Sequence, residues 1–126
     1  MKDYWFVSDT DGHLYDTRKD DWFYVPIRKD YRRTFPEINN VSQLKATLRA
    51  GEFTWPGFYP MYFITSDGAS LHFNCVRKNF RSVVDSVKNK INDGWRVIAC
   101  EINYEDKDLV CDCCGRKIDS AYGEEE

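Results

Sequence analysis

The sequence predicts an α+β fold, in which an antiparallel sheet of about five strands carries one long and one short helix packed on one face. Two stretches place an Asp-Gly pair between segments of alternating apolar residues, a pattern typical of β-hairpins. Two others carry apolar residues at helical spacing, and a last apolar run precedes a cysteine-bearing C-terminal tail. The order of these elements is typical of the α+β class.

A chain of 126 residues with 42% hydrophobic and 16% aromatic content can bury one hydrophobic core. We therefore expect a single domain, residues 1–126, in three consecutive parts. Residues 1–59 hold the first hairpin, a basic loop and the short helix. Residues 60–104 hold the second hairpin, the long helix and a central strand, and residues 105–126 form the acidic tail.

The first part of the chain contains one hairpin signal, one irregular stretch and one short helix. The hairpin is predicted in "YWFVSDTDGHLYD", and a similar one in the second part in "MYFITSDGASLHF". Residues 17–39 have two prolines and no clear period, which predicts a long, irregular, basic loop. The short helix follows from three apolar residues at helical spacing: Val41, Leu44 and Leu48. Asn40 or Ser42 would cap it, and Gly51 would end it before an aromatic link at residues 53–60.

The longest helix is predicted in "NCVRKNFRSVVDSVKNKINDGW" by six apolar residues at helical spacing: Val76, Phe80, Val83, Val84, Val87 and Ile91. Asn74 would cap this helix and Gly94 would end it. Its opposite face carries five basic side chains: Arg77, Lys78, Arg81, Lys88 and Lys90. The strand that follows, "WRVIACEINYE", is apolar on both faces, so we expect it to be central in the sheet.

Charges are segregated along the chain. From Arg18 to Arg49 eight basic residues stand against four acidic ones, a balance of +4; from Glu101 to Glu126 nine acidic residues stand against three basic ones, a balance of -6. Such a dipolar chain could dock electrostatically on a partner, although solvated surfaces give the same pattern. The net charge of only -3 argues against a general nucleic-acid-binding protein.

Whether the cysteines are expected to form disulfides depends on the cellular compartment of the protein. No apolar run approaches the length of a membrane span, and "MKDYW" lacks the basic start and apolar region of a signal peptide. We expect a cytoplasmic protein without membrane association. Thiols stay reduced there, so five cysteines are expected to be core residues, metal ligands or reactive thiols rather than disulfides.

The segment "CDCCG" places three cysteines in four positions. Its outer pair, Cys111 and Cys114, has the C-x-x-C spacing that lets two thiolates on a tight turn bind one tetrahedral zinc ion. Gly115 permits the left-handed turn that aims backbone amides at the sulfurs. The segment resembles the knuckle of zinc ribbons. We therefore predict a structural zinc site at Cys111, Cys114 and Cys113 that ties the acidic tail to the domain.

A complete zinc ribbon needs a second such pair, which the sequence lacks. The missing ligands could come from four residues distant in sequence: His13, His72, Cys75 and Cys100. A homodimer could also share one metal between two knuckles. Both distant cysteines would equally serve as small core residues. Free thiols or a redox pair are the alternatives to a metal at the knuckle.

No enzyme motif is present: the phosphate-binding G-x-x-x-x-G-K-[ST], the nucleophile elbow G-x-S-x-G and the zinc-protease H-E-x-x-H are all missing from the sequence. Cys113 or Cys114 with His72 or His13 would formally make a thiol dyad. A cysteine-dependent enzyme is therefore an alternative, and the expectation is a protein without catalytic activity.

Four segments of the second half resemble small accessory proteins of bacteriophages and other mobile elements of Firmicutes: "YFITSDGASLHF", "VRKNFRSVV", "GWRVIACEINYEDKDLVCD" and "GRKIDSAYGEEE". The likeness runs from about Pro60 to the C-terminus. It implies a phage-encoded protein that binds a host protein or regulates phage genes in the infected bacterium. Among such binders, some type II anti-CRISPR proteins are similar in size and acidity, and at least one carries a structural metal.

Two functions are expected on this basis. The first is an inhibitor that occludes a host defence protein, with a CRISPR effector nuclease as the favoured partner. Its contact surface would be an aromatic and arginine patch: Trp22, Tyr24, Arg28, Tyr31, Arg32 and Arg33. Those aromatics could instead simply cover the helices. The alternative function is a nucleic-acid-binding or regulatory accessory protein that uses the five basic residues of the long helix.

Overall fold

The computed structural model describes residues 3–8, 11–54 and 59–121. Over these residues the chain forms two strands, a helix, two strands, two helices and a strand. Part of the first predicted turn, the middle of the aromatic link and the closing "YGEEE" lie outside the described residues. None of the described helices has both the length and the apolar character needed to cross a membrane.

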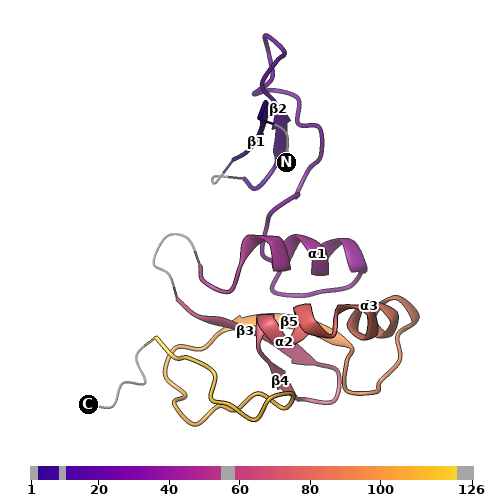
Figure 1. Cartoon of the computed structure of the whole chain (residues 1–126), viewed down its shortest axis with the longest axis vertical. Helices are drawn as coiled ribbons and strands as arrows, with labels where there is room; N and C mark the ends of the chain where they lie inside the picture. Colours follow the sequence, from indigo (N-terminus) through magenta and orange to yellow (C-terminus); the bar gives the residue numbers. More distant parts are fainter. Residues whose placement is uncertain (1–2, 9–10, 55–58, 122–126) are drawn as a thin grey trace.

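The α+β class is confirmed, but the strands form two antiparallel sheets and not one sheet of five. β1 (Trp5–Val7) pairs with β2 (Leu14–Asp16), and this hairpin stands apart at one end of the molecule (Figure 1). β3 (Met61–Thr65) pairs with β4 (Ser70–Leu71) and with β5 (Val97–Ile102) in the order β4-β3-β5. Hairpin patterns predict which neighbouring strands pair, but they carry no information on whether two hairpins join.

The prediction that the last strand is central was wrong, because β3 lies in the middle of the three-stranded sheet. The outer edge of β5 is nevertheless covered. The Ile38 N–H donates to the carbonyl oxygen of Ile98 at 2.9 Å, and the Cys100 N–H donates to the carbonyl oxygen of Pro36 at 3.1 Å. An irregular segment therefore satisfies an edge that the apolar pattern had suggested was covered by another strand.

The short helix has the predicted ends. α1 (Val41–Ala50) begins after Asn40, whose side chain accepts a hydrogen bond from the Gln43 N–H at 2.9 Å. It ends at Gly51, which has a φ of 97°. In this region of φ glycine avoids the steric cost that other residues meet.

The predicted long helix is divided into α2 (Phe73–Lys78) and α3 (Phe80–Asn89). Asn79 breaks the helical backbone with φ -109° and ψ 30°, and its side-chain amide donates to the carbonyl oxygen of Cys75 at 2.9 Å. The predicted caps were also wrong: the helical segment starts after His72, and it ends at Lys90 in a left-handed conformation. Apolar spacing continues across Asn79, so periodicity alone could not reveal the break.

The hydrophobic core lies between the three-stranded sheet and the helices. Its buried residues begin at Ile38 and end at Ile118, and the partly buried Phe35 packs against them. The C-terminal segment lies at the opposite end of the molecule from the β1–β2 hairpin (Figure 1). Below, residues 3–35 are called the lobe and residues 36–121 the body.

Candidate metal centre

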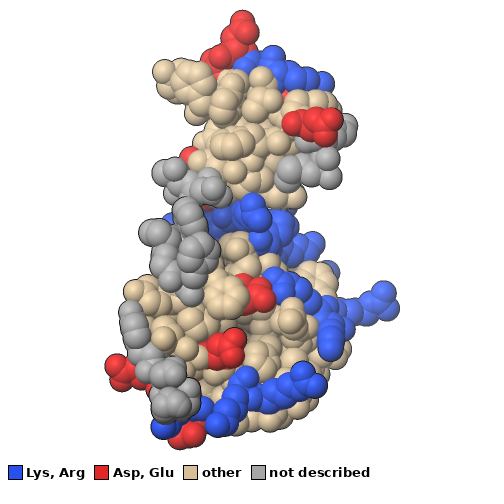
Figure 2. All heavy atoms as spheres, turned by 60° about the vertical axis from the view of Figure 1, so that its left-hand side comes forward, with Lys and Arg blue, Asp and Glu red and all other residues tan. Residues whose placement is uncertain are grey.

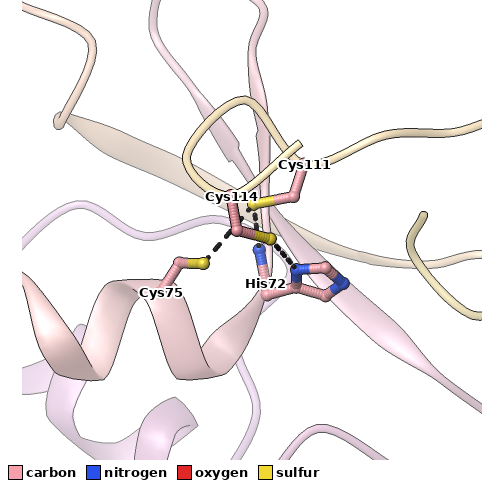
Figure 3. Close-up of side chains that lie close together, drawn as sticks. All are labelled: His72, Cys75, Cys111 and Cys114. Atoms are coloured by element: carbon pink, nitrogen blue, oxygen red, sulfur yellow. Dashed lines mark hydrogen bonds between the residues drawn. The ribbon is translucent and has the colours of Figure 1, made fainter. Parts of the chain in front are cut away.

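Four side chains from distant parts of the body converge on one point: His72, Cys75, Cys111 and Cys114 (Figure 3). Each offers one ligand atom, and these four atoms lie within 4.8 Å of one another. The Sγ atoms of Cys75 and Cys111 are 3.6 Å apart, and the Cys114 Sγ is 3.3 Å from the His72 Nδ1. Tetrahedral ligands at about 2.3 Å from a zinc ion would be roughly 3.7 Å from each other. The geometry therefore fits a four-coordinate metal ion.

Two short segments supply the ligands in pairs. His72 follows β4 and precedes the first residue of α2, and Cys75 lies in the first turn of that helix. Cys111 and Cys114 lie on the knuckle, a tight turn in which the Gly115 N–H donates to the Cys111 carbonyl oxygen at 2.8 Å. Gly115 has a φ of 73°, as the predicted left-handed turn requires. A metal ion would thus join the knuckle to the β4–α2 corner.

The histidine is oriented as a metal ligand. Its Nε2 lies 3.1 Å from the carbonyl oxygen of Lys117. A protonated Nε2 donates to that oxygen, which leaves the lone pair of Nδ1 directed at the cluster. Metal-binding histidines commonly donate their second ring N–H to a carbonyl oxygen in this way.

Backbone amides donate hydrogen bonds to the sulfurs of the knuckle cysteines. The His72 N–H donates to the Cys111 Sγ at 3.4 Å. A hydrogen bond from the Arg116 N–H lowers the pKa of the exposed Cys114 thiol. On the inner side of the cluster, burial raises the pKa of the Cys75 thiol. A metal that binds here would therefore displace a proton from Cys75.

Of the three predicted knuckle ligands, the structure places Cys111 and Cys114 in the cluster and Cys113 outside it. Cys113 is exposed, and its Sγ accepts a hydrogen bond from the Asn79 side chain at 3.6 Å. The tight turn brings its first and fourth residues to one side and leaves Cys113 on the outside. None of the five cysteines forms a disulfide.

Among the four distant candidates, His72 and Cys75 join the cluster, and the other two do not. Cys100 is buried with its Sγ 3.9 Å from the Met61 sulfur, and burial raises its pKa to about 12. His13 lies in the lobe, where its Nδ1 accepts a hydrogen bond from the Asp30 N–H. The useful signal was the H-x-x-C spacing of His72 and Cys75, which repeats the spacing of the knuckle pair.

The predicted partner-binding residues are divided between two places. Trp22 packs in the lobe against the rings of Phe6, Tyr15 and Phe23, at centroid distances of 5.6, 5.8 and 5.8 Å, and Tyr24 beside them is 75% exposed. Arg28 is also exposed. The other three residues lie at the junction between the lobe and α1 and make contacts there: Tyr31, Arg32 and Arg33.

The contacts at the junction are specific. The Arg49 guanidinium lies 4.2 Å from the centroid of the Tyr31 ring. The Arg32 Nε donates to the Arg49 carbonyl oxygen at 3.1 Å, and Arg33 forms an ion pair with Asp30 at 3.0 Å. The contacts of Tyr31 and Arg32 with Arg49 hold the lobe to the body, whereas the pair of Arg33 with Asp30 lies within the lobe. These contacts restrict the freedom of the three side chains to bind a partner.

The basic residues of the predicted long helix do not form one continuous helical face, because Asn79 separates α2 from α3. Arg77 donates to the carbonyl oxygen of Leu48 at 3.1 Å and pairs with Glu52 at 3.3 Å. The other four are exposed: Lys78, Arg81, Lys88 and Lys90.

No family model matches the chain, and neither a curated protein nor a solved structure shows significant similarity to it. Functional inference therefore depends on the metal centre and on the surfaces of the lobe and the body.

Proposed function

We propose that the four-residue cluster holds a structural zinc ion and that the chain is a non-enzymatic protein-binding module. The donor set of one imidazole and three sulfurs supports the zinc proposal. Soft sulfur donors suit zinc far better than magnesium or calcium. Four protein ligands also close the tetrahedral shell, as in structural sites, whereas catalytic zinc keeps one position for water or substrate.

Cobalt substitution tests the ligand set. Titration of the zinc-free protein with Co²⁺ should give the visible absorption of a tetrahedral thiolate site, with saturation at one equivalent. The Cys113→Ser variant should keep that spectrum, and Cys111→Ser should lose it. A spectrum typical of octahedral oxygen ligation would contradict the proposal, and so would loss of the signal in Cys113→Ser.

The protein-binding role is supported by the surface of the lobe. Five large apolar side chains within it are exposed by 44 to 75%: Phe6, Phe23, Tyr24, Val25 and Ile27. On the face drawn in Figure 2 the lobe has an uncharged area with acidic and basic side chains at its tip and one edge, and basic side chains gather where the lobe meets the body. Soluble monomers rarely leave such apolar groups together on the surface unless they bind something.

The partner we propose is a host defence protein, namely a CRISPR effector nuclease in the cytoplasm of an infected bacterium, which the lobe would occlude. The resemblance of the second half to phage accessory proteins supports this class of partner. Aromatic side chains are the residues that most often dominate the energy of such contacts.

A nuclease assay tests this proposal. Wild-type protein should inhibit target cleavage by a purified type II effector, and the double variant Phe23→Ala and Tyr24→Ala should lose inhibition while its melting temperature is unchanged. Ile91→Ala, which removes an exposed apolar side chain from the body, is the matched control. Equal inhibition by the double variant would contradict the role of the lobe, and no inhibition by wild type would contradict the partner class.

The alternative is nucleic-acid binding or regulation through the exposed basic residues of α2, α3 and the turn after α3. It predicts affinity for duplex DNA that falls steeply between 50 and 200 mM salt, on the order of a hundredfold or more if several phosphates are contacted. Charge reversal at Arg81 and Lys88 should abolish that affinity. Binding that does not respond to salt would contradict this alternative.

A further inference from the structure

A cavity of about 480 Å³ lies directly beside the metal centre. Its lining includes three of the four cluster residues: His72, Cys75 and Cys114. Apolar side chains that are 2 to 7% exposed also line it: Met61, Phe73 and Ile118. A cavity of this size can enclose a small ligand or a few side chains of a peptide. Its lining therefore combines apolar side chains with polar groups of the cluster.

The charges around the cavity favour an anion. Three exposed cations line it: Lys78, Arg116 and Lys117. Over the residues that the structure describes, none of these three takes part in an ion pair. Two carboxylates line it as well, but Glu52 is compensated by Arg77 at 3.3 Å, which leaves Asp119.

The charge of the metal centre must also be counted among the charges around the cavity. Zinc with three thiolates and a neutral imidazole would carry one negative charge, and Arg116, two residues after Cys114, lines the same cavity. The charges of Arg116 and the centre then offset each other. Lys78 and Lys117 are left against Asp119, an excess of one positive charge. Attraction of an anion should therefore be modest and weakened by salt.

We propose that this cavity binds an acidic peptide segment, with a carboxylate at Lys78 and Lys117 and an adjacent apolar side chain against Met61 and Phe73. The inference rests on the proposed protein-binding function and names an acidic segment of the partner as what docks here. A peptide fits better than a small dianion, because Asp119 would repel a second negative charge whereas the apolar walls would contact a peptide side chain.

The cavity also depends on the metal centre. Lys78 comes from α2, whereas Lys117 and Ile118 follow the knuckle. A backbone hydrogen bond from the Asp112 N–H to the Ser70 carbonyl oxygen at 2.9 Å already joins the knuckle to β4, and the proposed zinc ion would strengthen this link. Removal of the metal should therefore weaken peptide binding.

Fluorescence anisotropy with the full, zinc-loaded chain tests the proposal. The probe is a fluorescein-labelled, C-terminally amidated peptide, Gly-Leu-Glu-Leu-Gly-Gly, and the comparison peptide has Gln in place of its single Glu. We expect the acidic peptide to bind at least about fivefold more tightly at low salt, since a charge-assisted hydrogen bond is about twice as strong as a neutral one. The double variant Lys78→Ala and Lys117→Ala should remove that preference.

The matched control replaces Lys88 and Lys90, which are exposed and do not line the cavity. Zinc content and melting temperature are measured for each variant, so a misfolded protein is recognised. Equal affinity for both peptides, or an unchanged preference in the Lys78 and Lys117 variant, would overturn the proposal. The assay contains no nuclease and leaves the lobe untouched, so its outcome is separate from failure of the proposed inhibition.

Discussion

The lobe and the body are stabilised in different ways. In the body, buried apolar residues from helices and strands form one cluster, and Cys75 and Cys111 of the metal centre belong to it. In the lobe, the two three-residue strands bury only a few side chains, with Leu14 4% and Tyr15 7% exposed, and these lie outside the cluster of the body. Ring pairs join Phe6, Tyr15 and Trp22, and the Arg18 guanidinium lies 3.8 Å from the centroid of the Tyr4 ring.

The comparison shows that the body is the more stable region and the lobe is the region more available for binding. An isolated two-stranded hairpin is only marginally stable in water, so the lobe needs its ring contacts and its attachment to α1. Over the described residues, the lobe and the much longer body each expose five large apolar side chains, so exposed apolar groups are denser on the lobe. Local opening should therefore occur first in the lobe, and contact with a partner should stabilise it.

The largest expected effect comes from removing a buried ligand from the body. Cys111→Ser should abolish zinc binding and lower the melting temperature by roughly 10 °C or more, because binding energy at such a site becomes folding energy. Thermal unfolding with zinc quantification checks this. Cys113→Ser is the control and should retain both the metal and the wild-type melting temperature. Equal destabilisation by the two variants would contradict the assignment of the ligands.

The second-largest loss of stability is expected from truncating a core side chain in the body. Phe63 is fully buried and stacks on Phe73 at a centroid distance of 4.2 Å. Phe63→Ala should reduce the free energy of unfolding by about 3 to 5 kcal/mol, as measured by urea denaturation. The same change at Phe6, which is 44% exposed in the lobe, should cost much less. Similar losses at the two positions would remove the distinction between lobe and body.

A glycine substitution can disturb the lobe alone. Gly12 has a φ of 73°, and a Cβ added there would lie 2.1 Å from the carbonyl oxygen of Arg32. Gly12→Ala should accelerate amide hydrogen exchange throughout the lobe and leave the melting temperature of the body nearly unchanged. Gly68→Ala is the control, since its φ is also positive but no atom lies within 4 Å of the added Cβ. Cooperative loss of the body in Gly12→Ala would show that the two regions fold as one unit.

The smallest expected effect is a pH dependence of the lobe. Hydrogen bonds from the Arg18 side chain lower the pKa of Asp16 from 3.8 to about 2. The stabilisation is present above the unfolded value near 3.8 and is lost as the pH falls from about 4 to 2. Amide exchange of β1 and β2 across this range should show the loss, and Asp16→Asn should reduce it; the part that remains comes from Asp11, whose pKa is lowered by a hydrogen bond from the His13 N–H. An identical pH response in Asp16→Asn would contradict the assignment to this pair.

Local signals in the sequence predicted local structure. The Asn40 cap, the Gly51 terminus and the two Asp-Gly hairpins were all recognisable because each depends on residues close together in the chain. The break at Asn79 was not, since the side-chain bond to the Cys75 carbonyl leaves the apolar spacing intact. The separation of the two sheets depends on contacts between distant segments, about which hairpin patterns say nothing.

For the candidate metal centre too, the sequence predicted the part that depends on neighbouring residues and not the part that depends on distant ones. C-x-x-C spacing identified Cys111 and Cys114 because one tight turn places both sulfurs together. The second pair lies far away in sequence, with Cys75 and Cys111 separated by 36 positions, so only the fold brings them into contact. Cys113 could not be distinguished from its neighbours by spacing alone, because its exclusion follows from the direction of the turn.

The measurement that tests the central claim most directly is metal analysis of the purified protein together with its melting curve, before and after treatment with a chelator. We predict one zinc ion per chain, a large fall in the melting temperature on chelation, and recovery when zinc is restored. Absence of zinc with an unchanged melting curve would contradict a structural metal centre. One zinc ion per two chains would contradict the complete four-ligand site within a single chain.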